Sequence, residues 1–125
     1  MPIIHSYKEL LVWQKSIELV IAVYKLTDEF PNEEIYGLTS QIRRAAVSIP
    51  SNIAEGRSRG TRADFLHFLR MSYGSGAELE TQLEITKKLS KTMVLNYNEV
   101  GGVLNEVMKM LNVMISKLQA KKLTS

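Results

Sequence analysis

The chain has 125 residues, a formal net charge of +3 and no cysteine. This length suits a single domain with a sizeable core, and the lack of cysteine excludes disulfide bonds and thiolate metal sites. Residues 1–10 do not resemble a signal peptide, and no apolar run is long enough to span a bilayer. We therefore expect a soluble cytoplasmic protein that makes no contact with a membrane.

The charge is distributed unevenly along the chain. Residues 1–40 contain three lysines against six acidic residues, whereas residues 41–70 contain six arginines against two acidic residues. A local excess of arginine is typical of a surface that meets an anionic partner, but a solvated helix flank has the same composition. Charge alone leaves both interpretations open.

The spacing of apolar residues predicts a first helix over residues 7–30. A capping box would start it, in which the Ser6 side chain accepts from the Glu9 amide and the Glu9 carboxylate reaches back. Pro31 would end it, because proline disfavours the α conformation at the residue before it. The predicted buried stripe consists of Leu10, Trp13, Ile17, Val20 and Tyr24.

A second helix is predicted over residues 34–55, with Glu33 and Glu34 at its positive end. Its apolar stripe consists of Leu38, Ile42, Ala45, Ile49 and Ile53. Pro50 falls inside this stripe and should kink the helix, since proline removes a backbone hydrogen bond. Gly56 is predicted to act as the C-terminal stop.

A third helix is predicted over residues 62–89, after a capping box from Thr61 to Asp64. Its stripe consists of Phe65, Leu69, Ser72, Gly76, Leu79 and Leu83. Gly74 and Gly76 should each cost about 1 kcal/mol inside a helix. We therefore expect the close approach of another helix to offset this cost.

A fourth helix is predicted over residues 97–119, after a capping box from Asn96 to Glu99. Its stripe consists of Leu104, Val107, Leu111, Met114 and Leu118. Four amphipathic helices with short connections indicate an all-α fold, an antiparallel up-down-up-down four-helix bundle. We expect residues 1–125 to form one such domain.

Two of the predicted helices carry more apolar residues than one buried stripe requires. These additional residues are Leu11, Val12, Leu19, Ile21 and Val23 in the first helix, and Val103, Met108, Met110 and Ile115 in the fourth. A second buried contact, most simply with another copy of the chain, would explain them. A broad core face with scattered exposed aliphatic residues is the alternative.

Little in the sequence suggests catalysis or metal binding. Asp64 and His67 lie one helical turn apart, but a di-iron bundle needs two Glu-x-x-His elements and two further glutamates. Ser48 and Ser51 lack a histidine base that is oriented by a third group. We therefore expect no enzyme activity, metal, cofactor or small-molecule substrate.

Several runs of residues are far more specific than these patterns. Residues 41–56 read QIRRAAVSIPSNIAEG and follow YGLTS, while LLVWQK stands at residues 10–15, FP at 30–31 and GSGAEL at 74–79. With these runs the chain resembles, over residues 7–89, the four-helix-bundle proteins encoded within intervening sequences of 23S ribosomal RNA. The fourth helix matches that family only in character.

The resemblance implies a bundle that assembles into a ring, typically a pentamer, and that is not an enzyme. It also relates the chain to the accessory proteins of diversity-generating retroelements, in which a basic surface is expected to contact nucleic acid and a reverse transcriptase. The modest net charge of the present chain departs from that accessory branch.

Two hypotheses from different functional classes follow. The first is an oligomeric module that binds RNA or DNA. Its candidate residues are Arg43, Arg57, Arg59, Arg62, Lys87, Lys88 and Lys91. The second is a structural or adaptor homo-oligomer that binds a protein partner and uses its arginines in intersubunit salt bridges. In an antiparallel hairpin, Arg44 would lie level with Gly74 and could pair with Glu78.

Overall fold

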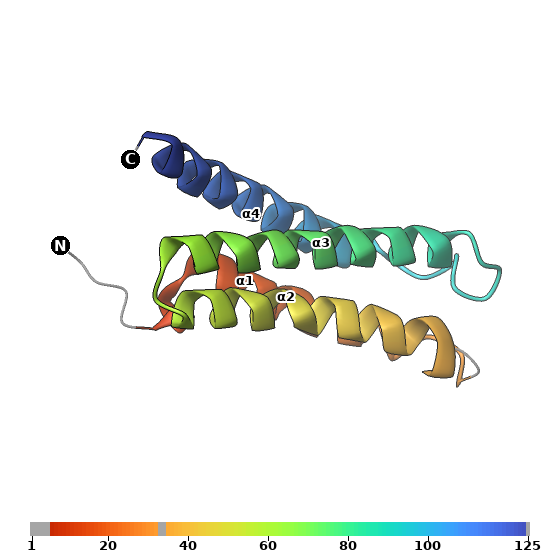
Figure 1. The fold of residues 1–125 in the computed structure, drawn as a ribbon. Helices are drawn as coiled ribbons and strands as arrows, with labels where there is room; N and C mark the ends of the chain where they lie inside the picture. The colour runs from red at the N-terminus through yellow and green to blue at the C-terminus, as the bar shows by residue number, and fades with distance from the viewer. Residues whose placement is uncertain (1–5, 33–34, 125) are drawn as a thin grey trace.

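The computed structural model describes residues 6–32 and 35–124, which contain helices and turns and no strand. The elements are η1 (Tyr7–Glu9), α1 (Leu11–Thr27), η3 (Ile35–Thr39), α2 (Ser40–Ser58), α3 (Arg62–Lys87) and α4 (Asn98–Thr124). Figure 1 shows the four α-helices side by side, each running opposite to the one before it. The prediction of an all-α four-helix bundle is therefore confirmed.

One cluster of buried residues draws side chains from all four helices. Its fully buried members include Leu19 of α1, Ile49 of α2, Leu69 of α3 and Leu111 of α4. The predicted stripes of the second, third and fourth helices supply most of this cluster, as the helical spacing of their apolar residues requires. Helix α2 packs against α1 and α3, and α4 packs against α1 and α3.

The start of the first helix differs from the prediction. The Ser6 side chain accepts a hydrogen bond from the amide of Lys8 at 3.1 Å, whereas the Glu9 amide donates to the Ser6 backbone carbonyl, so Ser6 caps the short 3-10 turn η1. Leu10 then has extended torsion angles, φ −72° and ψ 127°, and α1 begins after it. The predicted single helix is therefore a turn followed by a shorter helix, which also ends ahead of Pro31.

The buried face of α1 also differs from the prediction. Its buried residues are Val12, Ser16, Leu19, Ala22, Val23, Leu26 and Thr27. Within the predicted stripe, Trp13, Ile17 and Val20 are only partly buried and Tyr24 is exposed. Ser16 concealed the true face, because serine counts as polar in a periodicity analysis. Its hydroxyl is satisfied locally by the carbonyl of Trp13 at 2.7 Å.

Helix α2 does not stop where the sequence indicated. Gly56 is buried inside the helix, which continues to Ser58. The chain turns instead at Gly60, whose φ of 88° is the left-handed conformation that glycine adopts without strain. Pro50 is buried within α2, and the kink predicted there stays a prediction. Glu33 and Glu34 lie outside the described residues.

Gly56 is a point of close contact between α2 and α3. A Cβ atom placed there would lie 2.6 Å from the Cβ of Phe68 and 3.4 Å from the Cα of Phe65. Gly76 makes the predicted close contact as well, with the side chain of Met108 on α4. Gly74, in contrast, is exposed and has no atom within 4 Å of its Cβ position, so the expected contact there is absent within the described chain.

The connection between α3 and α4 is held by buried polar groups. The Tyr97 hydroxyl donates to the Thr92 carbonyl at 3.0 Å and lies 2.9 Å from the Thr86 hydroxyl. The Thr92 hydroxyl donates to the Thr86 carbonyl at 2.6 Å. At the start of α4, the Asn96 side chain accepts from the amide of Asn98, and not from Glu99 as the capping box required.

Candidate nucleic-acid interface

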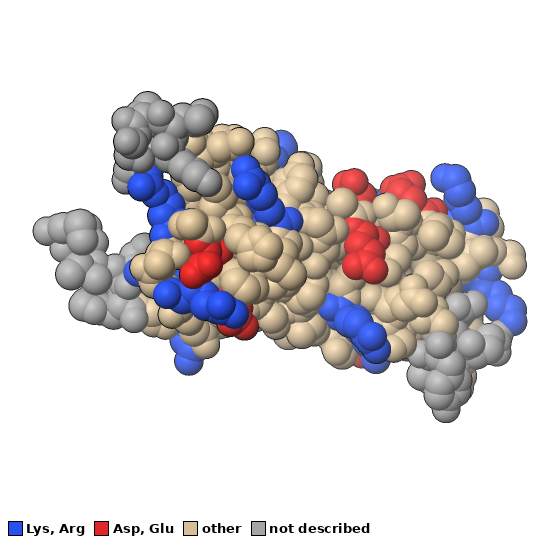
Figure 2. Space-filling view, viewed as in Figure 1, with Lys and Arg blue, Asp and Glu red and all other residues tan. Residues whose placement is uncertain are grey.

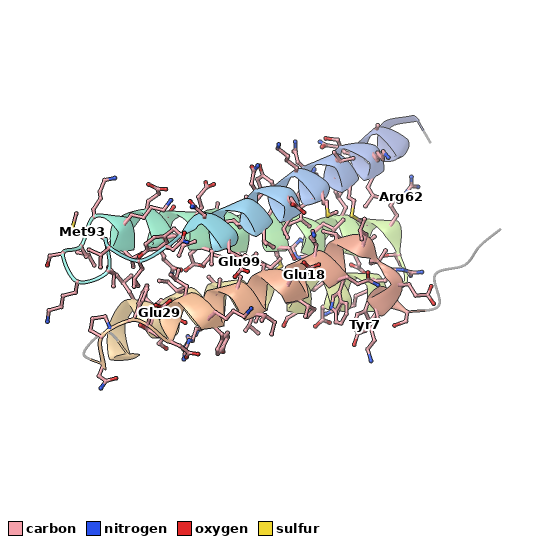
Figure 3. All side chains as sticks on the ribbon, turned by 180° about the vertical axis from the view of Figure 1, so that it is seen from behind. Tyr7, Glu18, Glu29, Arg62, Met93 and Glu99 are labelled. Atoms are coloured by element: carbon pink, nitrogen blue, oxygen red, sulfur yellow. The ribbon has the colours of Figure 1, made fainter. Side chains whose placement is uncertain are left out.

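The structure divides the predicted basic site into two groups at opposite ends of the bundle. Arg57, Arg59 and Arg62 lie at the α2–α3 turn, whereas Lys87 and the two lysines after it lie at the α3–α4 connection. Arg62 and Lys87 are the first and last of the 26 residues of α3, and 25 steps at 1.5 Å each are about 38 Å. Figure 3 shows Arg62 and Met93 at opposite ends of the bundle, and Figure 2 shows Lys and Arg side chains toward both ends of the visible face and also between them.

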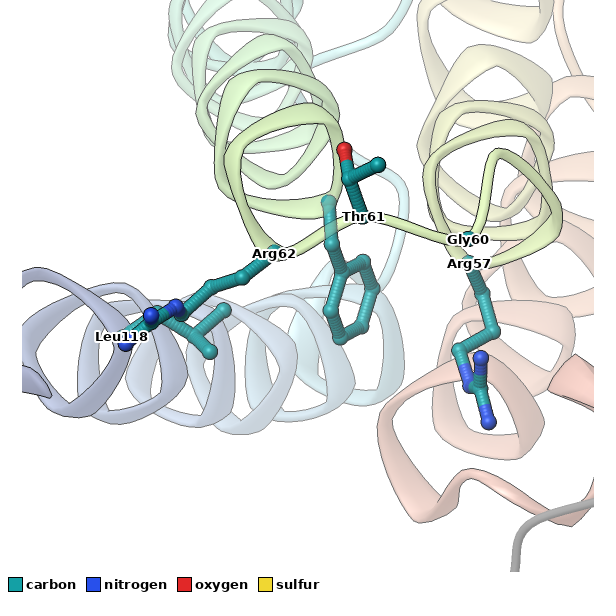
Figure 4. Close-up of a pocket in the computed structure, with 6 residues that line it drawn as sticks. Arg57, Gly60, Thr61, Arg62 and Leu118 are labelled. Carbon is teal, nitrogen blue, oxygen red and sulfur yellow. The ribbon is translucent and has the colours of Figure 1, made fainter. Parts of the chain in front are cut away.

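A cavity of about 470 Å³ opens at the α2–α3 turn. It is lined by Arg57, Gly60, Thr61, Arg62, Phe65 and Leu118. Figure 4 shows the Arg57 and Arg62 side chains diverging, Arg62 over α4 toward Leu118 and Arg57 toward the N-terminal part of the chain, drawn in pale red. The cavity therefore has two cationic flanks, and its apolar lining comes from two different helices.

Local sequence explains why these residues converge. Gly60 provides the left-handed turn that reverses the chain, and Thr61 accepts a hydrogen bond from the amide of Asp64 at 3.1 Å. This predicted cap is confirmed, and it starts α3 with Arg62 in the first turn. Gly56 lets α3 approach α2, which brings Phe65 to the cavity. The positive end of the α3 dipole also favours anions at this position.

Arg43 has a structural environment that the sequence did not reveal. Its Nη2 lies 2.9 Å from the Asp28 carboxylate, its Nε donates to the Thr27 hydroxyl at 2.8 Å, and its guanidinium lies 4.5 Å from the centre of the Tyr24 ring. These three contacts connect α2 to the end of α1. Arg43 is therefore held within the chain and lies apart from the cavity.

Arg59 is also engaged within the chain. Its Nε lies 2.9 Å from the Glu55 carboxylate, and its guanidinium lies 5.0 Å from the centre of the Phe68 ring. Both members of the ion pair are about half exposed, so the pair contributes little to stability. Arg59 does not line the cavity, although Arg57 and Arg62 on either side of it do.

The lysines at the other end surround an exposed apolar loop. Lys87 pairs with Glu84 at 3.1 Å and lies 5.6 Å from the centre of the Tyr97 ring. Lys88 and Lys91 are exposed in the same region, as are the neighbouring Leu89, Met93 and Val94. This group is too far from the α2–α3 turn to form one site with the arginines.

Arg44 and Glu78 do not pair with each other in the part of the chain that the structure describes. Both side chains are exposed, and neither takes part in the ion pairs found among the described residues. The intrachain form of the predicted pair is therefore absent. The form in which the two residues belong to neighbouring subunits stays a prediction.

An apolar groove of about 380 Å³ lies between the start of α1 and the second half of α4. It is lined by Leu10, Leu11, Val12, Lys109, Met110, Val113 and Met114. Leu11 and Val113 are 63% and 50% exposed. Farther along the same helix pair, Lys15 of α1 meets Glu106 of α4 at 3.2 Å, and the hydrogen bond and charge of this glutamate raise the pKa of the lysine.

Sequence reasoning assigned Phe65 and Leu118 to the core and did not connect them with a site. Phe65 begins the third stripe and Leu118 ends the fourth, and in an antiparallel bundle those two positions meet at one end. This topological relation is the signal that would have placed both residues beside the α2–α3 turn.

No helix in residues 6–32 and 35–124 is long and apolar enough to cross a membrane. Within the same ranges, no three His, Asp or Glu side chains come together in a way that could hold a metal ion.

Comparison with known proteins agrees with the fold and the runs of residues described above. The family model of the 23S rRNA-intervening sequence protein matches residues 8–113, which extends the similarity into α4. A crystal structure from Bacteroides thetaiotaomicron, of a protein of unknown function from the S23 ribosomal protein family, superposes with a TM-score of 0.71. It is 28% identical, and the match covers 84% of this chain and 98% of that one. No curated protein matches. The chain belongs to the family of 23S rRNA-intervening sequence proteins.

Proposed function

We propose that this protein is a non-enzymatic homo-oligomer that binds RNA or DNA through the cavity at the α2–α3 turn. The observation that carries the proposal is the pair of arginines that line that cavity, Arg57 in the last turn of α2 and Arg62 in the first turn of α3. Arginine recognises phosphate with a planar, bidentate arrangement of donors. Backbone phosphates are the ligands that this arrangement suits best.

The alternative is a structural or adaptor homo-oligomer that binds a protein partner. Arg43 and Arg59 favour this alternative, because both form ion pairs with carboxylates of the same chain. The two proposals share the oligomer and differ in the role of Arg57 and Arg62. A binding experiment on those two residues therefore separates them.

The apolar groove between α1 and α4 supports the oligomer. Exposed aliphatic side chains that line a continuous groove are typical of a contact with another subunit. A heterologous contact of this kind closes into a ring when the rotation between subunits permits, and the five-fold ring implied by the family resemblance is one such arrangement. A ring would repeat each α2–α3 turn once per subunit, so that several weak phosphate contacts act together.

Sedimentation at micromolar concentration is expected to show a species several times heavier than the 14.2 kDa chain. Val113→Lys places a charge in the apolar groove and should shift this species toward the monomer, because an unpaired charge is costly in a buried contact. Val94→Lys is the matched control, since Val94 is exposed and outside the groove. A wild-type monomer across the dilution series contradicts the oligomer, and equal effects of both substitutions contradict the role of the groove.

Removing both charges of the cavity, by Arg57→Gln with Arg62→Gln, is expected to weaken nucleic-acid binding about tenfold or more. Fluorescence anisotropy with a labelled RNA measures this, at about 50 mM and about 200 mM salt, because phosphate binding weakens steeply as salt rises. Arg44→Gln with Arg70→Gln is the matched control, since it removes two exposed charges that do not line the cavity. No binding by the wild type at the lower salt, or equal losses in the two variants, favours the adaptor instead.

A further inference from the structure

The cavity at the α2–α3 turn contains more than phosphate binding requires. Beside its two arginines it presents the aromatic side chain of Phe65 from α3 and the aliphatic side chain of Leu118 from α4. A site for phosphate alone needs cations and backbone amides, and apolar walls add nothing to it. The lining therefore suits a ligand that is part anion and part flat apolar ring.

We propose that the cavity takes an unpaired nucleobase, which stacks on Phe65 while Arg57 and Arg62 bind the phosphates on either side of it. The protein would thus select single-stranded over double-stranded nucleic acid. This inference rests on the proposed nucleic-acid binding and goes beyond it, because it names the form of the ligand and the residue that recognises it.

The position of the arginines fits a strand that passes over the cavity. Arg57 comes from the end of α2 and Arg62 from the first turn of α3, and Figure 4 shows their side chains extending away from one another. Two cations on opposite flanks bind two phosphates, and the base between those phosphates then faces the cavity. Its volume of about 470 Å³ lies within the range of about 300–1,000 Å³ that is usual for small-ligand pockets.

A duplex cannot use such a cavity without opening. Paired bases are stacked on their neighbours inside the helix, and only an unstacked base reaches an aromatic side chain of the protein. Taking a base out of a duplex costs unstacking and unpairing energy, which a single strand does not require. Stacking on an aromatic side chain is also tolerant of base identity, so little sequence preference is expected.

A second phenylalanine on the same helix provides an internal comparison. The Phe68 ring lies 5.0 Å from the Arg59 guanidinium, and its Cβ is the atom nearest to Gly56. Phe68 does not line the cavity, whereas Phe65 does. Both side chains are partly buried, so Phe68→Leu controls for the loss of a phenylalanine ring from the packing. Only the substitution at Phe65 removes an aromatic ring from the cavity.

The first test compares a labelled single-stranded RNA with a duplex of the same sequence by anisotropy at about 50 mM salt. Wild type should bind the single strand about tenfold more tightly, and Phe65→Leu should lose about tenfold of that affinity while keeping its affinity for the duplex. Phe68→Leu should change neither value more than about twofold, if stacking is confined to the cavity. Circular dichroism melting confirms that both variants fold.

The second test uses wild type alone and so does not depend on the folding of a variant. Single-stranded RNA with 5-iodouridine is irradiated on the protein, and the linked peptide is sequenced by mass spectrometry. Trypsin releases residues 63–70 as one peptide, which contains both phenylalanines. We expect the crosslink on Phe65 and not on Phe68.

The outcomes separate this inference from the proposed function. Equal affinity for single strand and duplex, an unaffected Phe65→Leu variant, or a crosslink away from Phe65 overturns base stacking. If Arg57→Gln with Arg62→Gln weakens binding about tenfold or more in that case, the phosphate contacts stand. If wild type binds neither nucleic acid, both proposals fail.

Discussion

Leu19→Ala is expected to lower the free energy of unfolding by about 2–5 kcal/mol, the usual cost of truncating a buried leucine. Leu19 has no exposed surface and belongs to the central cluster that all four helices share. The truncation leaves a cavity that the neighbouring helices cannot fill without moving, and the spread of the estimate reflects how far they relax. Urea unfolding, followed by circular dichroism at one fixed protein concentration, measures the loss.

A matched pair of valines on α1 tests whether the buried face of this helix is the one described here. Val23 is fully buried, whereas Val20, which the periodicity placed in the core, is only partly buried. Val23→Ala should therefore lower the free energy of unfolding clearly more than Val20→Ala does. Both substitutions remove the same two methyl groups and change the helix propensity equally. The reverse order would support the stripe predicted from the sequence.

Gly56→Ala is expected to lower the free energy of unfolding by about 2–3 kcal/mol, as overpacking of a helix contact does. The added methyl group would lie 2.6 Å from the Cβ of Phe68. This atom is attached directly to the backbone and cannot move away by rotation of a side chain, so α2 and α3 must separate. Because Phe65 also lies against Gly56, the substitution should displace the aromatic wall of the cavity and weaken single-strand binding.

The other glycines of the bundle supply the controls for this result. Gly74→Ala should raise stability by up to about 1 kcal/mol, because its Cβ position is open and alanine favours a helix. The stability change of Gly76→Ala should lie between those of Gly56→Ala and Gly74→Ala, since the side chain of Met108 can rotate away from the new methyl group. A stabilised Gly56→Ala variant would contradict the close helix approach. A destabilised Gly74→Ala variant would instead indicate that another subunit covers this site.

Much of the secondary structure could be predicted from the sequence alone. Most residues of the stripes predicted for the second, third and fourth helices are buried, because each stripe repeats one apolar face over several turns and such a face has to be buried. The residues at the ends of these stripes are only partly buried, namely Leu38, Phe65, Met114 and Leu118. The cap at Thr61 was correct because it depends on residues within one turn. The bundle itself followed from four such helices with short connections, and the similarity of residues 8–113 to the family agrees with it.

The tertiary structure decided the features that depend on neighbouring helices. Helix α1 is apolar on two sides, so its own sequence did not reveal that Ser16 faces the core and Leu11 the surface. Gly56 and Gly60 are equally plausible helix stops in the sequence. In the structure, Gly56 is a contact between α2 and α3, and Gly60 is the residue at which the chain turns.

The same limit applies to the basic residues of the candidate site. In the sequence the arginines are visible only as a local excess of positive charge. A charge count does not say where each side chain points. Arg43 meets Thr27 and Asp28 because the start of α2 lies beside the end of α1, whereas Arg57 and Arg62 line a cavity to which α4 contributes Leu118. The sequence determined which helices form, and the contacts between those helices decided which basic residues line the cavity.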